Sequence, residues 1–599
     1  MTGKKRSRFF GIPLILPYMK PYVKRIIFMI ILGILSSLID SVFPLFHRHV
    51  LDKNVMGRTL EGLPPVIILY IVILLFQVWD NYITTYICSR LELWVDRDLR
   101  NRAFHHLQTL SFSYFNQHNV GYIHARIMSD TGKIGVLTSW RMMDIVWNLS
   151  YIICVIAVML FVNLRLALVI MALIPVAVVI IIWFQSKLVP LNRRVREINS
   201  TITGDFNEGI TGIHTIKTLV AEDKMNEAFR VDTSDMENTA VRTAHHSALF
   251  KSLMTFLSYL ALALVLWQGG KLTMDNVIMI GTLSVFMTYA LGILEPIQNI
   301  INTISELITI QVNIERFTGL ISTSSDVKDT DEVIEKYGNT FEPKKENWEE
   351  LKGDVEFEDV SFIYPDGDEY VLKDFSLKVP FGTNVAIVGE TGAGKSTLVN
   401  LVCRFYEPTE GRILIDGRDA RERSQGWLHS HLGYVLQTPH LFTGTVRENL
   451  IYGKEDADEE EIIKALKAVY AYDIVMRMDK GLDTDIGEGG NMLSTGERQL
   501  LSFARAILAD PRILILDEAT SSVDTVTEKK IQDAIKTVIK GRTSFVIAHR
   551  LSTVIDADII LAVKDGKIVE RGTHKELMDM KGYYHSLYMS QFIEASADV

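Results

Sequence analysis

Six long apolar segments in the first half of the chain restrict its fold more than any other feature. They cover residues 26–45, 65–87, 145–162, 166–184, 253–267 and 277–294. A helix needs about 20 mainly apolar residues to cross a bilayer, and the fifth segment reaches that length only if its helix extends back through Ala248. One such segment alone could be a buried core helix, but six at this spacing predict a helical membrane domain.

Basic residues cluster on one side of these segments and predict their orientation. They precede the first segment, fill the long loop between the second and third, and follow the fourth. By the positive-inside rule, the N-terminus and both long loops are cytosolic. The rest of the chain follows an even number of spans, so we expect it in the cytosol of a multi-pass protein of the cell (plasma) membrane. No small-residue cleavage site follows the first segment, so we expect no cleavable signal peptide.

The composition changes after about residue 310, where short apolar runs alternate with charged stretches as in a soluble α/β domain. We therefore predict a transmembrane domain over residues 1–320, a polar linker over 321–352 and a second domain over 353–599. The net charge of -10 gives no reason to expect nucleic acid as a partner. The three cysteines are Cys88, directly after the second apolar segment, Cys154 in the third, and Cys403 after the phosphate loop, so we expect buried thiols rather than a disulfide framework.

Both long loops have helical composition, which predicts that the spans continue as helices beyond the membrane. Each loop contains a glycine-marked break, at residues 115–121 and 207–212. A break at this distance from the bilayer is a natural place for a short transverse helix that touches another domain. An ordinary helix–helix turn is the alternative.

A glycine-rich segment in the second domain indicates nucleotide chemistry. Residues 389–397 read GETGAGKST, follow the apolar run 385–388 and precede a helical sequence that runs from Ser396 to Tyr406. A buried strand that leads into a glycine-rich turn and then a helix lets backbone N–H groups converge on one anion. Lys395 would then bind the terminal phosphates, and Ser396 a magnesium ion. A chance glycine-rich turn is the alternative.

Two carboxylates follow a second buried strand. Asp517 and Glu518 come directly after a short apolar run. At the carboxyl end of a parallel strand beside a phosphate loop, the first carboxylate can hold magnesium and the second can polarise water for in-line attack. Gln437 and His549 also follow strand-like runs, although either could be an ordinary loop residue. Tyr364 could stack on a purine or belong to the core.

Residues 493–499, which read LSTGERQ, resemble the signature segment of ATP-binding cassette (ABC) proteins. The order of phosphate loop, Gln437, signature, carboxylate pair, Asp524 and His549 matches a whole cassette. Six spans ahead of one cassette resemble an exporter half-transporter of the type IV, B-type multidrug family. The resemblance implies an α-helical transmembrane domain, with six spans and long cytosolic helical extensions, followed by an α/β P-loop nucleotide-binding domain.

The resemblance also implies roles by position, with ATP and Mg²⁺ as cofactors. Residues 115–121 and 207–218 would be coupling helices, and residues 487–490 the loop that contacts them. The implied catalytic residues are Glu518 as general base, His549 at the γ-phosphate and Gln437. The implied nucleotide-binding residues are Tyr364 on adenine, then Gly389, Glu390, Thr391, Gly392, Ala393, Gly394, Lys395, Ser396, Thr397 and Asp517. The implied metal-binding residues are Ser396, Gln437 and Asp517. The signature residues Ser494, Thr495, Gly496 and Glu497 would contact the ATP of the other cassette, and Asp524 would signal across the dimer.

These expectations describe the ATP-hydrolysing subunit of a dimeric exporter that moves hydrophobic or amphipathic small molecules, such as drugs or lipids, out of the cytosol or inner leaflet. Closure of two cassettes around ATP would drive the spans through the coupling helices. A lipid flippase or an importer of exporter architecture is an alternative within transport. A nucleotide-gated sensor or channel is an alternative of another class. Asp40 and Asp80 lie in spans and could contact cargo or pair with a neighbouring helix.

The signature departs from the usual Leu-Ser-Gly-Gly-Gln at two positions. Thr495 adds bulk where glycine lets the backbone approach a phosphate, and Glu497 adds a carboxylate near a polyanion. The alternative is that Thr495 is tolerated and Glu497 caps the following helix. Since the phosphate-loop side is intact, we predict a heterodimer whose partner, a second half-transporter, keeps the consensus signature and lacks an equivalent of Glu518.

Overall fold

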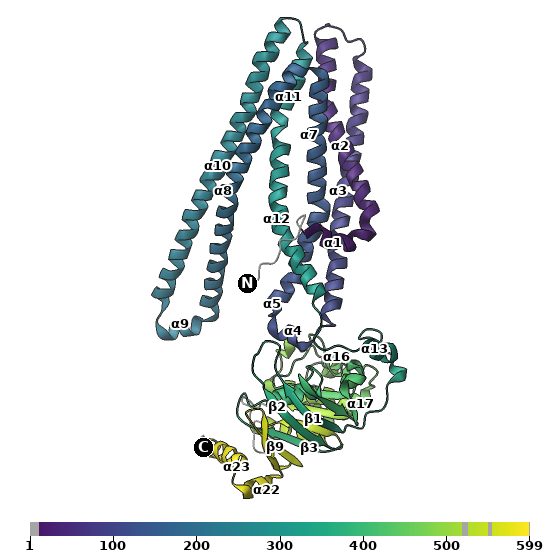
Figure 1. Cartoon of the computed structure of the whole chain (residues 1–599), viewed down its shortest axis with the longest axis vertical. Helices are drawn as coiled ribbons and strands as arrows, with labels where there is room; N and C mark the ends of the chain where they lie inside the picture. The colour runs from purple at the N-terminus through teal and green to yellow at the C-terminus, as the bar shows by residue number, and fades with distance from the viewer. Residues whose placement is uncertain (1–10, 518–524, 549–553, 598–599) are drawn as a thin grey trace. The chain divides into compact units, whose positions relative to one another are not determined.

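The structure is a computed structural model that describes residues 11–517, 525–548 and 554–597 (Figure 1). Its contacts divide the chain into two compact units. One unit holds the residues up to 106 together with 121–323, and the other holds 107–120 together with the chain from 324 onward. A short segment from the N-terminal half, residues 107–120, thus belongs with the C-terminal unit.

The first unit consists of long helices, and the predicted number of spans is confirmed. Six stretches among the described residues are long and apolar enough to cross a membrane. The fifth includes Ala248, as its length required, while the sixth begins at Ile280 because residues 275–279 form a turn. The helices are α1 (Ile12–Met19), α2 (Val23–His49), α3 (Leu63–Leu107), α5 (Val120–His124), α6 (Thr131–Val136), α7 (Met142–Val162), α8 (Leu164–Thr211), α9 (Ile213–Leu219), α10 (Glu222–Met274), α11 (Ile280–Gly292) and α12 (Leu294–Ser322), with the 3-10 turn η2 (Lys20–Tyr22) and the π-helical turns η3 (Val50–Val55), η4 (Ala125–Asp130) and η5 (Leu137–Arg141).

Packing inside this unit leaves an apolar surface outside. Helices α8 and α10 run side by side (Figure 1), and α2 packs on α7. A buried cluster between helices includes Phe184, Phe286 and Tyr289. The outer side chains of α3 are apolar, for example Ile68, which is 62% exposed, and Leu75, which is 61% exposed. Such a surface is what a lipid-facing helix presents.

The second unit is an α/β domain with two sheets. An antiparallel sheet has the order β2-β1-β4-β5, and the larger sheet has the order β10-β9-β3-β8-β7-β6, in which all strands except β10 run parallel. The interior strands β3, β7 and β8 are nearly continuous apolar runs, as burial on both faces requires. The strands are β1 (Val355–Phe362), β2 (Leu372–Val379), β3 (Asn384–Val388), β4 (Glu410–Ile415), β5 (Arg418–Asp419), β6 (Leu432–Val435), β7 (Ile513–Asp517), β8 (Thr543–Ile547), β9 (Ile559–Lys564) and β10 (Lys567–Gly572).

Helices surround these sheets. The described helices and 3-10 turns of this unit are α4 (Phe112–Gln117), α13 (Asp331–Tyr337), η6 (Lys345–Asn347), α14 (Lys395–Val402), η7 (Ala420–Glu422), α15 (Gln425–Ser430), α16 (Val446–Ile451), α17 (Glu459–Ala468), α18 (Tyr472–Met476), η8 (Gly481–Asp483), η9 (Glu488–Gly490), α19 (Thr495–Leu508), α20 (Thr525–Ile539), α22 (His574–Met580) and α23 (Tyr583–Ala597).

The helix after the phosphate loop is shorter than the sequence predicts. We expected it to continue to Tyr406, but α14 ends at Val402. Arg404 adopts a left-handed φ of 53°; its N–H donates to the carbonyl of Leu401 at 3.0 Å, and the N–H of Phe405 donates to that of Asn400 at 2.9 Å. This is a Schellman helix end, in which glycine usually takes the left-handed position. A side chain in that conformation costs about 1–2 kcal/mol, which other contacts have to offset.

The segment with linker composition packs onto the second unit. Tyr337 is buried, and its hydroxyl donates to Oε1 of Glu349 at 2.8 Å. The indole N–H of Trp427, a core residue, donates to the backbone carbonyl of Glu349 at 2.7 Å. Residues between 324 and 349 are therefore an ordered part of this unit rather than a free connection.

Candidate functional site

The carboxyl ends of parallel strands bring the predicted site residues to one edge of the larger sheet. Strand β3 leads into the phosphate loop, β7 ends at Asp517, and Gln437 comes two residues after the end of β6. Strand β6 pairs with β7, and β8 lies between β7 and β3. Since carboxyl ends of parallel strands share an edge, the loop, Asp517 and Gln437 lie along the same edge.

The phosphate loop has the backbone that its glycines permit. Gly389, Gly392 and Gly394 have φ values of 156°, 85° and 99°, which L side chains rarely adopt. A Cβ on Gly389 would lie 2.2 Å from the carbonyl oxygen of Val563, so only glycine fits beside β9. Gly394 precedes α14 and provides no side-chain cap, which leaves the first N–H groups of that helix for an anion.

Lys395 lies inside the loop. Its Nζ donates to the carbonyl of Gly389 at 2.6 Å and to that of Glu390 at 2.8 Å. An ammonium has three donors, so one remains for a phosphate oxygen. Burial lowers the pKa of Lys395, and the negative charge of Asp517 opposes this shift. Asp517 is therefore within electrostatic reach of the loop.

Tyr364 lies against the helix that follows the phosphate loop. Its hydroxyl is 2.9 Å from Oγ1 of Thr397. Its ring makes edge contacts with Phe362 and Tyr406, with centroids 4.8 Å and 5.1 Å away. The ring packs half-buried against the core, and its stacking on adenine stays a prediction.

The signature residues form the start of α19. The helix begins at Thr495 because Ser494 is its N-cap. Ser494 Oγ accepts the N–H of Glu497 at 3.3 Å, and the Glu497 carboxylate accepts the N–H and the hydroxyl of Ser494, both at 2.9 Å. Arg498 donates to Oγ1 of Thr495 at 3.2 Å, and Gly496 is buried. Glu497 thus closes a capping box and brings its charge to Ser494.

Three of the predicted residues, Glu518, Asp524 and His549, lie outside the described residues. Glu518 follows the last residue of β7, and His549 follows Ala548, just beyond β8. Their roles stay predictions.

Helix α4 makes a contact that sequence reasoning missed. Phe112 of α4 stacks on Phe405, with ring centroids 4.1 Å apart. The amide of Asn116 donates to the hydroxyl of Tyr406 at 2.7 Å. A cavity of about 460 Å³ beside this contact is lined by α4, Tyr406 and Tyr364. The glycine-marked break indicated a short helix here, and the only sequence signal for its partner was the pair of aromatic residues that begins three positions after α14 ends.

The two aspartates singled out in the spans differ in burial, since Asp40 is half-buried and Asp80 is buried. Asp40 accepts hydrogen bonds from the amide of Gln77 and, at 3.2 Å, from the indole of Trp147. Asp80 is completely buried, so cargo would reach it only in another conformation. Pairing across helices thus accounts for Asp40 in this structure.

Comparison with known proteins identifies the family. The profile of the ABC transporter transmembrane region matches residues 26–297, and the profile of the ABC transporter domain matches residues 372–521. The chain therefore belongs to the ABC transporters, as an exporter-type half-transporter with one membrane domain fused to one nucleotide-binding domain. It is an ATPase coupled to transport across a membrane.

Relatives cover nearly the whole chain. It is 37% identical to the "Probable multidrug resistance ABC transporter ATP-binding/permease protein YheH" of Bacillus subtilis, over 89% of this chain and 77% of that protein. It is 33% identical to an "ATP-dependent lipid A-core flippase" of Desulfotalea psychrophila, over 91% of this chain and 93% of that protein. The "Uncharacterized ABC transporter ATP-binding protein YfiC" of Bacillus subtilis is 32% identical, over 93% of this chain and 90% of that protein.

Proposed function

We propose that this chain is the ATP-hydrolysing subunit of a dimeric exporter that moves hydrophobic or amphipathic small molecules out of the cytosol or the inner leaflet of the cell membrane. The observation that carries the proposal is the shared sheet edge that holds the phosphate loop, Asp517 and Gln437, in a chain that also has six candidate spans. The names of the multidrug and lipid relatives support the cargo class.

The residues at this edge fit ATP with Mg²⁺. Magnesium takes one or two carboxylates, waters and substrate phosphates rather than an all-protein cage. The described residues contain no group of three or more His, Cys, Asp or Glu side chains suited to a metal, whereas Ser396, Asp517 and Gln437 can share a metal with the phosphates. Bound magnesium would neutralise phosphate charge, Lys395 would bind the terminal phosphates, and Glu518 would orient the attacking water.

The geometry of the signature favours two unequal sites. In a closed dimer, Ser494 would face the γ-phosphate of ATP held by the other cassette. The Glu497 carboxylate accepts a hydrogen bond from the Ser494 hydroxyl at 2.9 Å, so that donor is not available to the phosphate, and it places like charge nearby. The site built with this signature would bind ATP and hydrolyse it slowly. The other site would combine Glu518 with a consensus signature, so the partner is a different chain.

Reconstitution in proteoliposomes tests the transport function. Cassette-out vesicles should accumulate a fluorescent amphipathic dye when ATP is added outside, and Lys395→Ala should abolish this uptake because a charge on the terminal phosphates is lost. Movement of a fluorescent phospholipid without movement of the dye would make the protein a flippase. ATP turnover that moves neither probe and does not respond to them would make it a sensor.

A further inference from the structure

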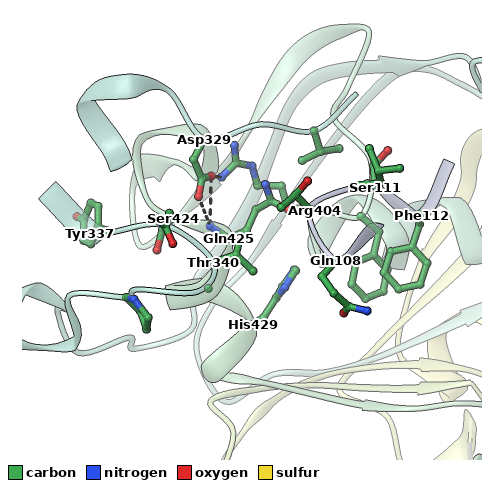
Figure 2. Close-up of a pocket in the computed structure, with 18 of the residues that line it drawn as sticks. Gln108, Ser111, Phe112, Asp329, Tyr337, Thr340, Arg404, Ser424, Gln425 and His429 are labelled. Atoms are coloured by element: carbon green, nitrogen blue, oxygen red, sulfur yellow. Dashed lines mark hydrogen bonds and ion pairs between the residues drawn. The ribbon is translucent and has the colours of Figure 1, made fainter. Parts of the chain in front are cut away.

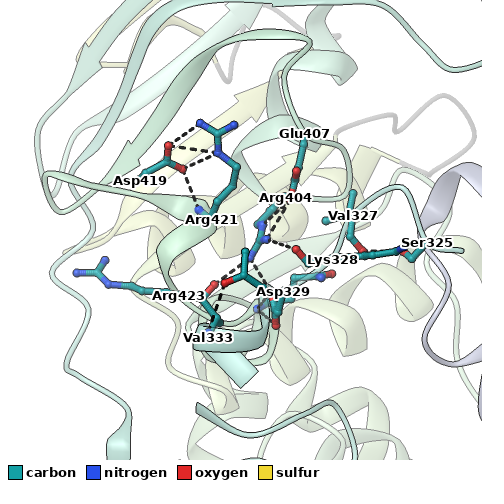
Figure 3. Close-up of polar contacts among 12 residues, drawn as sticks. Ser325, Val327, Lys328, Asp329, Val333, Arg404, Glu407, Asp419, Arg421 and Arg423 are labelled. Carbon is teal, nitrogen blue, oxygen red and sulfur yellow. Dashed lines mark hydrogen bonds and ion pairs between the residues drawn. The ribbon is translucent and has the colours of Figure 1, made fainter. Parts of the chain in front are cut away.

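Three consecutive residues that follow α14 and its C-cap Cys403 contact different segments of the chain. Phe405 and Tyr406 contact α4. Arg404, which precedes them, binds Lys328 and Asp329, which belong to residues 325–329, a segment that we call the strap (Figure 3). The strap follows α12, the last candidate span, which ends at Ser322.

The guanidinium of Arg404 is buried and uses all five of its N–H donors. Its side chain is 3% exposed. Nη1 donates to Oδ1 of Asp329 and to the carbonyl of Arg423, both at 2.8 Å. Nη2 donates to the carbonyl of Lys328 at 3.1 Å and to Glu407 at 3.0 Å, and Nε donates to Glu407 at 3.2 Å. One buried cation is thus shared by a carboxylate of the strap and a carboxylate of the nucleotide-binding domain.

Other contacts hold the strap in place. Asp329 Oδ2 accepts the N–H of Gln425, at the start of α15, at 3.1 Å. Val327 is buried, and its carbonyl accepts the hydroxyl of Ser325 at 2.7 Å. A flexible tether would not bury an ion pair, so these contacts indicate that the strap is an ordered part of the domain.

The strap and α4 reach the domain on different sides of one cavity. Gln108 and Phe112 line one side of this cavity of about 320 Å³, Asp329 and Tyr337 line the other, and Arg404 lies between them (Figure 2). The strap contact is therefore separate from the α4 contact.

The backbone of Arg404 indicates that its side chain matters. It occupies the left-handed position of a helix end where glycine would be unstrained. Glycine would also lose all five hydrogen bonds. A strained residue that persists for the sake of its contacts points to a role beyond ending the helix.

We propose that Arg404 is a positioning residue that couples the strap, and through it the last membrane helix, to the helix that binds the nucleotide phosphates. Helix α14 begins at Lys395 and is about 12 Å long, so it moves as one rigid piece. When its N-terminus shifts as the cassettes close around ATP, Arg404 shifts with it and carries Asp329 along. The proposal rests on the function proposed above. In addition to the coupling helices, it gives a second connection between the nucleotide-binding domain and the spans, through the covalent chain of the strap.

The two carboxylate partners of Arg404 provide a matched test. Asp329→Asn and Glu407→Gln each remove one negative charge that pairs with the Arg404 guanidinium, but only Asp329 belongs to the strap. In the full-length protein with its partner, Asp329→Asn should lower the ratio of ATP turnover with the amphipathic dye to basal turnover about threefold or more, with nucleotide affinity unchanged. Glu407→Gln should leave that ratio unchanged even where it lowers the melting temperature equally. An unchanged ratio in Asp329→Asn, or an equal loss in both variants, overturns the proposal.

A second variant covers the case in which Asp329→Asn fails to fold. Two glycines inserted between Thr323 and Ser324 keep the ion pair and lengthen the connection between α12 and the strap by up to about 7 Å. They should lower the same ratio as much as Asp329→Asn, and a normal ratio would overturn the proposal.

A measurement of the conformational change that ATP binding causes needs no cargo, so it tests this proposal separately from the transport function. In the Glu518→Gln background, energy transfer between dyes at the ends of two spans should report the change that ATP binding causes. Asp329→Asn should shift the half-maximal ATP concentration about threefold while Glu407→Gln does not. An unshifted midpoint overturns the strap role, whereas absent cargo movement in the unmodified protein refutes only the exporter function.

Discussion

Glu497 has two effects that one substitution can separate. Its carboxylate closes the capping box of α19, and it also brings a negative charge to Ser494. Glutamine can close the same box without the charge. The alternative that Glu497 merely caps the helix and the proposal that it weakens a nucleotide site are therefore distinguishable at this one residue.

We expect Glu497→Gln to raise ATP turnover by the chain on its own several-fold, since about 1 kcal/mol of repulsion is roughly a factor of five. Stability should change by less than about 0.5 kcal/mol because the cap persists. Turnover of the purified chain and its melting temperature measure the two effects. Glu497→Ala is the control, which should lose the cap as well. Unchanged turnover in Glu497→Gln would leave Glu497 a capping residue only.

Glu518 and Lys395 should give different phenotypes. Glu518→Gln should keep ATP binding nearly intact and lower hydrolysis about a hundredfold or more, because a positioned base is lost. Lys395→Ala should weaken binding itself, because a charge on the phosphates is lost. Equilibrium binding of labelled ATP and single-turnover hydrolysis separate the two steps. Near-normal turnover in Glu518→Gln would refute its role as base.

At the residue scale, the sequence motifs predicted those features whose conformation depends on neighbouring residues in the chain. The glycines of the phosphate loop and the strand before Asp517 lie where the sequence indicated, because their conformations depend on neighbouring residues. The end of α14 was not predictable. Arg404 takes a left-handed conformation that is offset by Asp329, which is 75 residues away in the sequence, so no local pattern could signal it.

At the scale of elements, we interpret the short helices at the two breaks as those that couple the cassettes to the spans. The glycine marks indicated breaks near both places, and the structure has α4 at Phe112–Gln117 and α9 at Ile213–Leu219. The face that α4 uses could not be predicted, because stacking of Phe112 on Phe405 depends on the folded nucleotide-binding domain.

We expect Phe112→Ala to reduce cargo-stimulated turnover of the full protein while basal nucleotide binding persists. The stack is worth about 0.5–1.5 kcal/mol beyond its buried area, so a loss of about threefold to tenfold should follow. Phe115→Ala is the matched control, since Phe115 lies on the same helix and its described ring contact is with Tyr114. Turnover with and without cargo measures the effect. Equal losses in both variants would mean that α4 acts through a different surface.

At the scale of the whole molecule, the proposed function needs two cassettes, since the signature would act on the ATP of the other cassette. We expect this chain alone to be a poor ATPase, and co-expression with its partner to restore turnover that Glu518→Gln abolishes. Size-exclusion chromatography with turnover of each fraction measures both properties. A homodimer with full activity would reject the heterodimer, and a partner with its own glutamate at the Glu518 position would reject the unequal sites.

The packing of residues 324–349 changes where a stable nucleotide-binding fragment begins. Composition places the boundary at residue 353, but a fragment that begins there lacks Asp329, Lys328 and the buried Tyr337. Hydrogen bonds to a charged group contribute about 1.5–3 kcal/mol each. We therefore expect fragment 324–599 to withstand more urea than fragment 353–599, and equal unfolding midpoints would contradict this. The folding unit starts within sequence that by composition alone would be trimmed away.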